Sequence, residues 1–210
     1  SPPADAADRL RTCEVLSIYA SRDADAVPDA VRALPNLRAL SLGPTVRTPT
    51  WLAGFSPLVE LELARPVGEM PPLPPTLRII RHGDGPSNLD HVRGPPPLAE
   101  LDIGDHRWRP CPMWLDELRL RAFAATNVSI PAFAEALRGM PLIRLKFVRA
   151  VPPPQPGLEG DAIENRRALD RALADPRALR ALDLQGYPLA PFPEVVRGLV
   201  HLRELTLRDA

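Results

Sequence analysis

The sequence predicts an α/β fold, a solenoid in which short strands form one parallel sheet. A hexapeptide of pattern L-x-x-L-x-L recurs about nine times along the 210 residues. Most copies follow one another after 19 to 24 residues. Leucine-rich repeats have this period, with one strand and one return segment in each repeat. We therefore expect a leucine-rich repeat horseshoe of about nine irregular repeats, with a parallel concave sheet and one or two helical insertions on the convex side.

Each hexapeptide predicts one strand, because its central apolar residue faces a core while its neighbours face outward. The weaker copies run from Cys13 to Ile18 and from Leu77 to His82. The central residues are at positions 16, 40, 61, 80, 101, 118, 145, 182 and 205, so the steps are 24, 21, 19, 21, 17, 27, 37 and 23. The sixth strand is therefore expected within Leu115 to Leu120.

The segments between the hexapeptides predict short returns. Val27 to Leu34 and Phe192 to Leu199 share the order apolar, Pro, acidic, two apolar residues, Arg, small, Leu. Proline suits the first turn of a helical or extended return, where its missing N–H has no cost. The Asn that usually follows each strand of a leucine-rich repeat is absent, which predicts a less uniformly curved sheet. The residues at that position are Thr45, Pro66, Gly85, His106, Phe123, Ala150 and Tyr187.

The two longest steps predict helices. The first, over about 129–138, has Pro131 in its first turn and Gly139 as a stop signal. The second, over about 161–174, begins with a capping-box-like pair, Asp161 and Glu164. A proline loop, 152–157, precedes the second helix. It is either a spacer or, less in keeping with the rest of the chain, a ligand for SH3-like domains.

The composition favours one domain over residues 1–210, and we expect this chain to be a piece of a longer protein. Its formal net charge of +0 gives no general attraction to nucleic acid or anionic membrane. No apolar run is long enough to span a bilayer. Cys13 and Cys111 are far apart in the sequence and lack metal-ligand spacing, which favours two buried thiols in a reducing compartment over a disulfide framework.

The sequence contains no recognisable active site, so we expect no catalytic residue, no cofactor, no metal and no enzyme activity in this chain. The four histidines lie in different repeats without partners at metal-ligand spacing. Gly83-Asp-Gly85-Pro lacks the lysine and the helix of a phosphate loop, and it reads as a turn.

The outward positions of the strands are the candidate binding site. Acidic residues dominate strands three to five, and basic residues dominate strands six and seven. We expect Arg119, Arg121, Arg144 and Lys146 to form one basic patch that holds an acidic protein segment or a phosphate. Nucleic acid is disfavoured because no aromatic residues lie between the basic ones, and a merely solvated surface is the alternative. The full candidate set is Glu60, Glu62, Arg81, Glu100, Asp102, Glu117, Arg119, Arg121, Arg144, Lys146, Asp183 and Gln185.

The LPPTL return and the ending FPEVVRGLVHLRELTLRD resemble the leucine-rich repeat domains of bacterial type III secreted effectors, of the IpaH or XopL type. The resemblance implies a module that binds a host protein in the host cytoplasm or nucleus. It also implies, as an alternative, the substrate-recognition or autoinhibitory part of an effector ubiquitin ligase, which would meet the ubiquitin-conjugating machinery through a catalytic domain elsewhere. A non-secreted bacterial scaffold is a further alternative. Lys146 is the only lysine beside 25 arginines (26 − 1), which fits either GC-rich coding or a ligase that avoids modifying itself.

Overall fold

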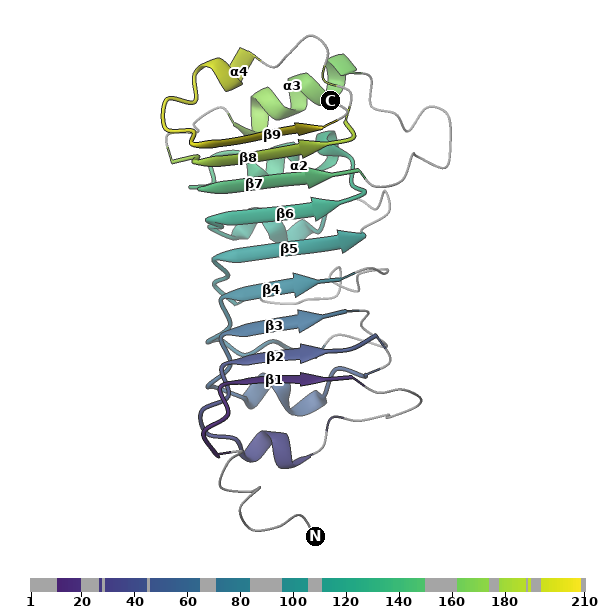
Figure 1. The fold of residues 1–210 in the computed structure, drawn as a ribbon, viewed down its shortest axis with the longest axis vertical. Coiled ribbons are helices and arrows are strands. Elements are labelled where there is room, and N and C mark those ends of the chain that lie inside the picture. The colour runs from purple at the N-terminus through teal and green to yellow at the C-terminus, as the bar shows by residue number, and fades with distance from the viewer. Residues whose placement is uncertain are drawn as a thin grey trace. The chain divides into compact units, whose positions relative to one another are not determined.

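The computed structural model describes residues 11–19, 27, 29–44, 46–64, 71–83, 96–105, 111–149, 162–173, 178–187, 189 and 194–208. Within these residues it contains nine strands, all parallel, in the chain order β1 to β9 (Figure 1). Helices lie between most neighbouring strands of the described residues. The α/β class and the parallel sheet are thus as the sequence predicted. Two compact units, Ser1–Leu98 and Ala99–Ala210, divide the chain.

The first unit contains four strands in register. Leu16, Leu40, Leu61 and Ile80 occupy one row across them, as the central positions of the hexapeptides predict. The elements are β1 (Val15–Ile18), η1 (Asp29–Ala33), β2 (Ala39–Leu42), η2 (Thr50–Gly54), β3 (Glu60–Leu63) and β4 (Ile79–His82).

The second unit contains five strands and the longer helices. Its central row consists of Leu101, Phe123, Leu145, Leu182 and Leu205. The elements are β5 (Glu100–Asp105), η4 (Met113–Glu117), β6 (Ala122–Thr126), α2 (Ile130–Leu137), β7 (Arg144–Val148), α3 (Ala162–Ala172), β8 (Ala181–Gln185), α4 (Glu194–Arg197) and β9 (Glu204–Arg208).

Alternation of apolar and polar side chains places the core of the second unit on one face of its strands. Phe123 and Phe147 are buried there, with ring centroids 5.9 Å apart. Phe133 of α2 lies 5.8 Å from Phe123, so α2 covers this inner face, and Figure 1 shows α2 behind the strands. The opposite face of the strands, which we call the outer face, carries the polar residues.

Both predicted helices are present. Ser129 is the N-cap of α2, Pro131 lies in its first turn, and Gly139 follows it with a left-handed φ of 74°. That backbone conformation suits glycine, as the stop signal predicted. The other helix, α3, covers most of the predicted range 161–174. Asp161 and the proline loop 152–157 lie outside the described residues.

The predicted position of the sixth strand was wrong. Leu115 belongs to η4, and the strand begins only at Ala122, with Phe123 in the central row. The hexapeptide of this repeat is therefore Leu120-Arg-Ala-Phe123-Ala-Ala125. With Phe123 as the centre, the steps from Leu101 and to Leu145 are both 22 residues (123 − 101 and 145 − 123). The apparent steps of 17 and 27 arise because Leu118 precedes β6 and is not the central residue of that strand.

Candidate binding face of the second unit

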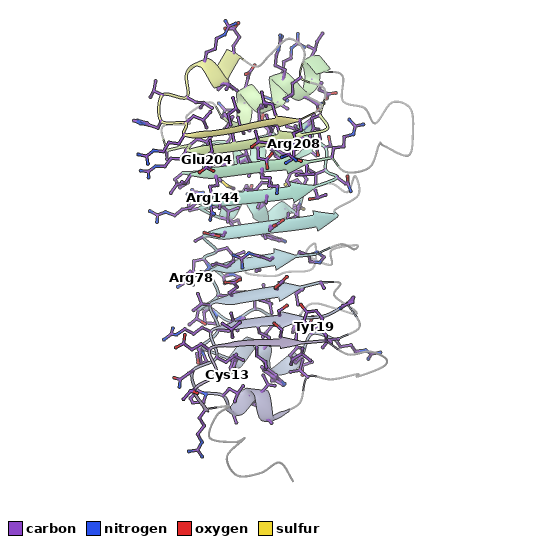
Figure 2. All side chains as sticks on the ribbon, in the orientation of Figure 1. Cys13, Tyr19, Arg78, Arg144, Glu204 and Arg208 are labelled. Carbon is purple, nitrogen blue, oxygen red and sulfur yellow. The ribbon has the colours of Figure 1, made fainter. Side chains whose placement is uncertain are left out.

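The outer face of β5 to β9 presents two rows of side chains at the registered positions of neighbouring strands. Strands in a sheet lie about 4.8 Å apart, so members of one row are close neighbours. The first row is Glu100, Ala122, Arg144, Ala181 and Glu204. The second row is Asp102, Ala124, Lys146, Asp183 and Thr206. Figure 2 shows Arg144 and Glu204 toward the starting end of their strands and Arg208 toward the other end.

Alanine at two positions of β6 leaves a shallow floor in the middle of this face. The Arg144 guanidinium crosses the floor, because its Nη2 donates to Glu100 Oε1 at 2.8 Å. Their strands are two apart, and hence about 9.6 Å apart in backbone. A longer side chain at Ala122, which lies between them in the row, would obstruct this bond. The small residue is thus part of the arrangement.

Asp183 is the centre of a second polar group on the outer face. Lys146 Nζ lies 3.9 Å from Asp183 Oδ2. Gln185 Nε2 donates to both carboxylate oxygens of Asp183, at 2.8 and 3.1 Å. The two basic side chains of β7 are therefore each paired to a different neighbour, Arg144 toward β5 and Lys146 toward β8.

The ion pairs of the outer face are accessible to solvent. The side chains of Arg144 and Lys146 are 59% and 51% exposed. Exposed pairs of this kind contribute about 0–1 kcal/mol, since each charge is also well solvated alone. A binding partner could therefore replace either acidic neighbour at little cost.

In the first unit, the predicted residues Glu60, Glu62 and Arg81 also lie on the polar side of their strands. Glu62 and Arg81 are registered neighbours on β3 and β4 and are both exposed. Arg81 forms an ion pair with Glu60, which lies on β3 two residues before its registered neighbour Glu62. The positive charge of Arg81 is thus neutralised within this group.

Three predicted site residues do not lie on a strand. Glu117 is the last residue of η4. Arg119 Nη1 donates to the Leu118 carbonyl at 2.9 Å, and Arg121 directly precedes β6. The basic patch expected from four residues therefore reduces to Arg144 and Lys146 on the outer face. The leucine pattern does not reveal the outward alanines of β6, because Phe123 and Ala125 take the inward positions of this strand. The even 22-residue steps are the signal that could have found them.

Tyr187 supports this part of the sheet from the inner side. It is 2% exposed, and its hydroxyl donates to the Val128 carbonyl at 2.8 Å. Its ring also lies edge-on to Phe147, with 6.3 Å between centroids. Burial raises the pKa of the Tyr187 phenol well above its ordinary value, although the positive charge of the nearby Arg149 acts in the opposite direction. The neutral phenol is therefore the form that the fold holds.

Other chemistry-bearing residues do not gather into a site within the described part of the chain. No group of three or more His, Cys, Asp or Glu residues there could hold a metal ion. His82 is buried at the end of β4, with Nδ1 2.9 Å from the Gly83 carbonyl oxygen, and His201 is exposed. Cys13 and Cys111 are thiols, but both are half-buried and not fully buried as predicted. His91 and His106 lie outside the described residues.

Comparison with models of known protein families, with curated proteins and with solved structures found no match. Among the described helices, none has the length and apolar character needed to cross a membrane. A functional assignment must therefore come from the geometry of the outer face.

Proposed function

We propose that this chain is a leucine-rich repeat module that binds a protein partner through the outer face of β5 to β9. The observation that carries the proposal is the pair of exposed basic residues, Arg144 and Lys146, beside the alanine floor of β6. Each has an acidic neighbour that a partner carboxylate could replace. Ala124, the floor position that Arg144 does not cross, gives room for a partner side chain between Asp102 of β5 and Lys146 of β7.

The preferred partner is a protein segment with acidic side chains. Carboxylates of the segment would take the positions that Glu100 and Asp183 now hold near Arg144 and Lys146, with charge-assisted hydrogen bonds. Basic groups of the same segment would meet the released carboxylates. Such exchange gives orientation and specificity more than raw affinity.

The resemblance to secreted effectors supports a host protein as the partner and the host cytoplasm or nucleus as the compartment. In the effectors that the repeats resemble, ligase activity lies in a separate catalytic domain. We accordingly assign binding, and no catalysis, to residues 1–210.

The experiment combines site-specific crosslinking with charge reversal. A photo-crosslinking residue at Ala124 captures the partner, which is then identified, purified and titrated. We expect R144E/K146E to weaken its binding at least about tenfold, because reversal places like charges beside the partner's acidic groups.

R138E/R167E is the matched control, because it changes the net charge by the same amount. Arg138 is the C-cap of α2 and Arg167 lies on α3, and both helices are away from the outer face. Retained affinity in R144E/K146E, or an equal loss in R138E/R167E, would contradict the proposal. Circular dichroism and thermal melting establish that both variants fold.

A further inference from the structure

A second feature of the second unit lies where β8 and β9 begin. A pocket of about 410 Å³ opens there. Its polar lining comes from Arg180, His201 and Arg203, and Ile143, Val200 and Leu202 provide apolar lining. No acidic side chain lines it among the described residues. The pocket thus combines positive charge with a smaller apolar surface.

The sheet fixes the two arginines side by side. The Arg180 N–H donates to the Ile143 carbonyl at 2.8 Å, and the Arg203 N–H donates to the Arg180 carbonyl at 2.8 Å. These bonds extend the strand pairing one residue before β7, β8 and β9. Arg180 and Arg203 are therefore about 4.8 Å apart in backbone, as neighbouring strand residues are.

The guanidinium groups of this pair differ from that of Arg144, which is bound to Glu100. Within the described part of the chain, neither the Arg180 nor the Arg203 guanidinium has a hydrogen-bond acceptor or an acidic partner. Two adjacent cations repel each other, so an anion placed between them would gain from both. Arginine also presents paired N–H groups that match the oxygens of a phosphate.

The apolar side of the pocket indicates what carries the anion. Val200 is 83% exposed, although it is a large apolar residue, and it lines the pocket together with Leu202. The volume lies near the lower end of the range for small-molecule sites, about 300–1,000 Å³. Inorganic phosphate would leave this apolar surface uncovered, whereas a monoester would cover it.

We propose that this pocket binds a phosphate monoester, with the phosphate held by Arg180 and Arg203 and the ester group packed against Val200 and Leu202. His201 would contribute a further N–H donor to the phosphate. The proposal goes beyond binding through the outer face and does not depend on it, because the two sites share no residue.

The test is titration of the intact chain with phenyl phosphate, followed by phosphorus NMR or calorimetry. We expect saturable binding that R180A/R203A weakens at least about tenfold, since charge-assisted hydrogen bonds are the strong ones. R144A/K146A, which removes the same charge from the outer face, should bind phenyl phosphate as the parent does. The affinity of R180K/R203K for phenyl phosphate should lie between those of the parent and R180A/R203A, because lysine keeps the charge and loses the paired donors.

Two further probes define the ligand. Inorganic phosphate should bind more weakly than phenyl phosphate, and equal binding would overturn the role of the apolar surface. N-acetyl-phosphotyrosine amide binding more tightly than phenyl phosphate would assign the monoester to a modified protein, and weaker binding would assign it to a free small molecule. Both of these results support a monoester site. Unchanged affinity in folded R180A/R203A, or an equal loss in R144A/K146A, would overturn the proposal while leaving the outer-face proposal unaffected.

Discussion

At the scale of single residues, Tyr187 makes a side-chain hydrogen bond to the backbone at a position where leucine-rich repeats usually have asparagine. It stands three residues after the last apolar position of its hexapeptide, Leu184 (184 + 3), where leucine-rich repeats usually place Asn. Val128 stands at the same position after Ala125 (125 + 3). The hydroxyl of Tyr187 reaches the Val128 carbonyl, so one long side chain connects equivalent positions of two different repeats. An absent Asn therefore does not mean that the turn backbone lacks side-chain support.

The hydrogen bond of Tyr187 makes a stability prediction. Y187F removes the hydroxyl and keeps the ring against Phe147. The loss of stability should therefore come mainly from leaving the buried Val128 carbonyl without its hydrogen bond. We expect the free energy of unfolding to fall by about 1–2 kcal/mol. Y19F is the control, because Tyr19 is 68% exposed and should change stability by no more than about 0.5 kcal/mol. Equal effects of the two substitutions in denaturant melts would contradict this.

The raised pKa of Tyr187 also predicts a loss of stability at high pH. Below the ordinary tyrosine pKa of about 10, the phenol is neutral in folded and unfolded chains, and pH has no effect through this group. Above it, the unfolded chain releases the proton while the folded chain keeps it, so rising pH favours unfolding. The difference in unfolding free energy between parent and Y187F should therefore shrink between about pH 9 and pH 11. A difference that stays constant over this range would show that the phenol ionises freely in the fold.

At the scale of elements, β6 shows where the sequence pattern suffices and where it does not. Strands such as β3 and β7 lie where their hexapeptides predict them, since leucine at the apolar positions marks the inward face. At β6 the leucines belong to η4 and the segment after it, while Phe123 and Ala125 fill the inward positions. The aromatic ring of Phe123 meets Phe133 and Phe147, a combination of partners that only the folded chain brings together.

The wrong position predicted for β6 also affected the predicted binding site, because it placed Glu117, Arg119 and Arg121 on the outward face of a strand. Alternation along β5, β7 and β8 was enough to place Glu100, Arg144 and Asp183 on the outer face. The bridge from Arg144 to Glu100 could not be predicted, because it spans three strands and depends on Ala122 between them. Arg180 and Arg203 were not candidates, since each directly precedes its strand, although both occupy the second position of their hexapeptides.

The structure-based register of β6 can be tested by one core substitution. F123A should lower the free energy of unfolding by about 3–5 kcal/mol, because it leaves a cavity between α2 and β7. M113A is the control, as Met113 in the same repeat is 93% exposed and its removal should cost little. If F123A cost less than about 1 kcal/mol, Phe123 would not hold the central position of its strand.

At the scale of the whole molecule, the inward residues of the outermost strands are less buried than those between them. In the second unit, Leu145 of β7 is 1% exposed, whereas Leu205 of β9 is 45% exposed. In the first unit, Leu16 of β1 is half-buried, whereas Leu61 of β3 is fully buried. Repeat folds gain stability from contacts between neighbouring repeats, so a strand with one neighbour gains less than a strand with two.

This gradient predicts unequal effects of the same substitution along the second unit. L145A should lower the free energy of unfolding by about 2–5 kcal/mol, as buried leucines do. L205A removes the same atoms from the equivalent position but should cost less than half as much, because Leu205 is already partly in contact with water. Amide hydrogen exchange should follow the same order, with β9 less protected than β7. Equal losses of unfolding free energy in L145A and L205A, together with equal amide protection of β7 and β9, would contradict this prediction. Such results would show that the second unit unfolds as one cooperative block and that Leu205 contributes as much as a buried leucine.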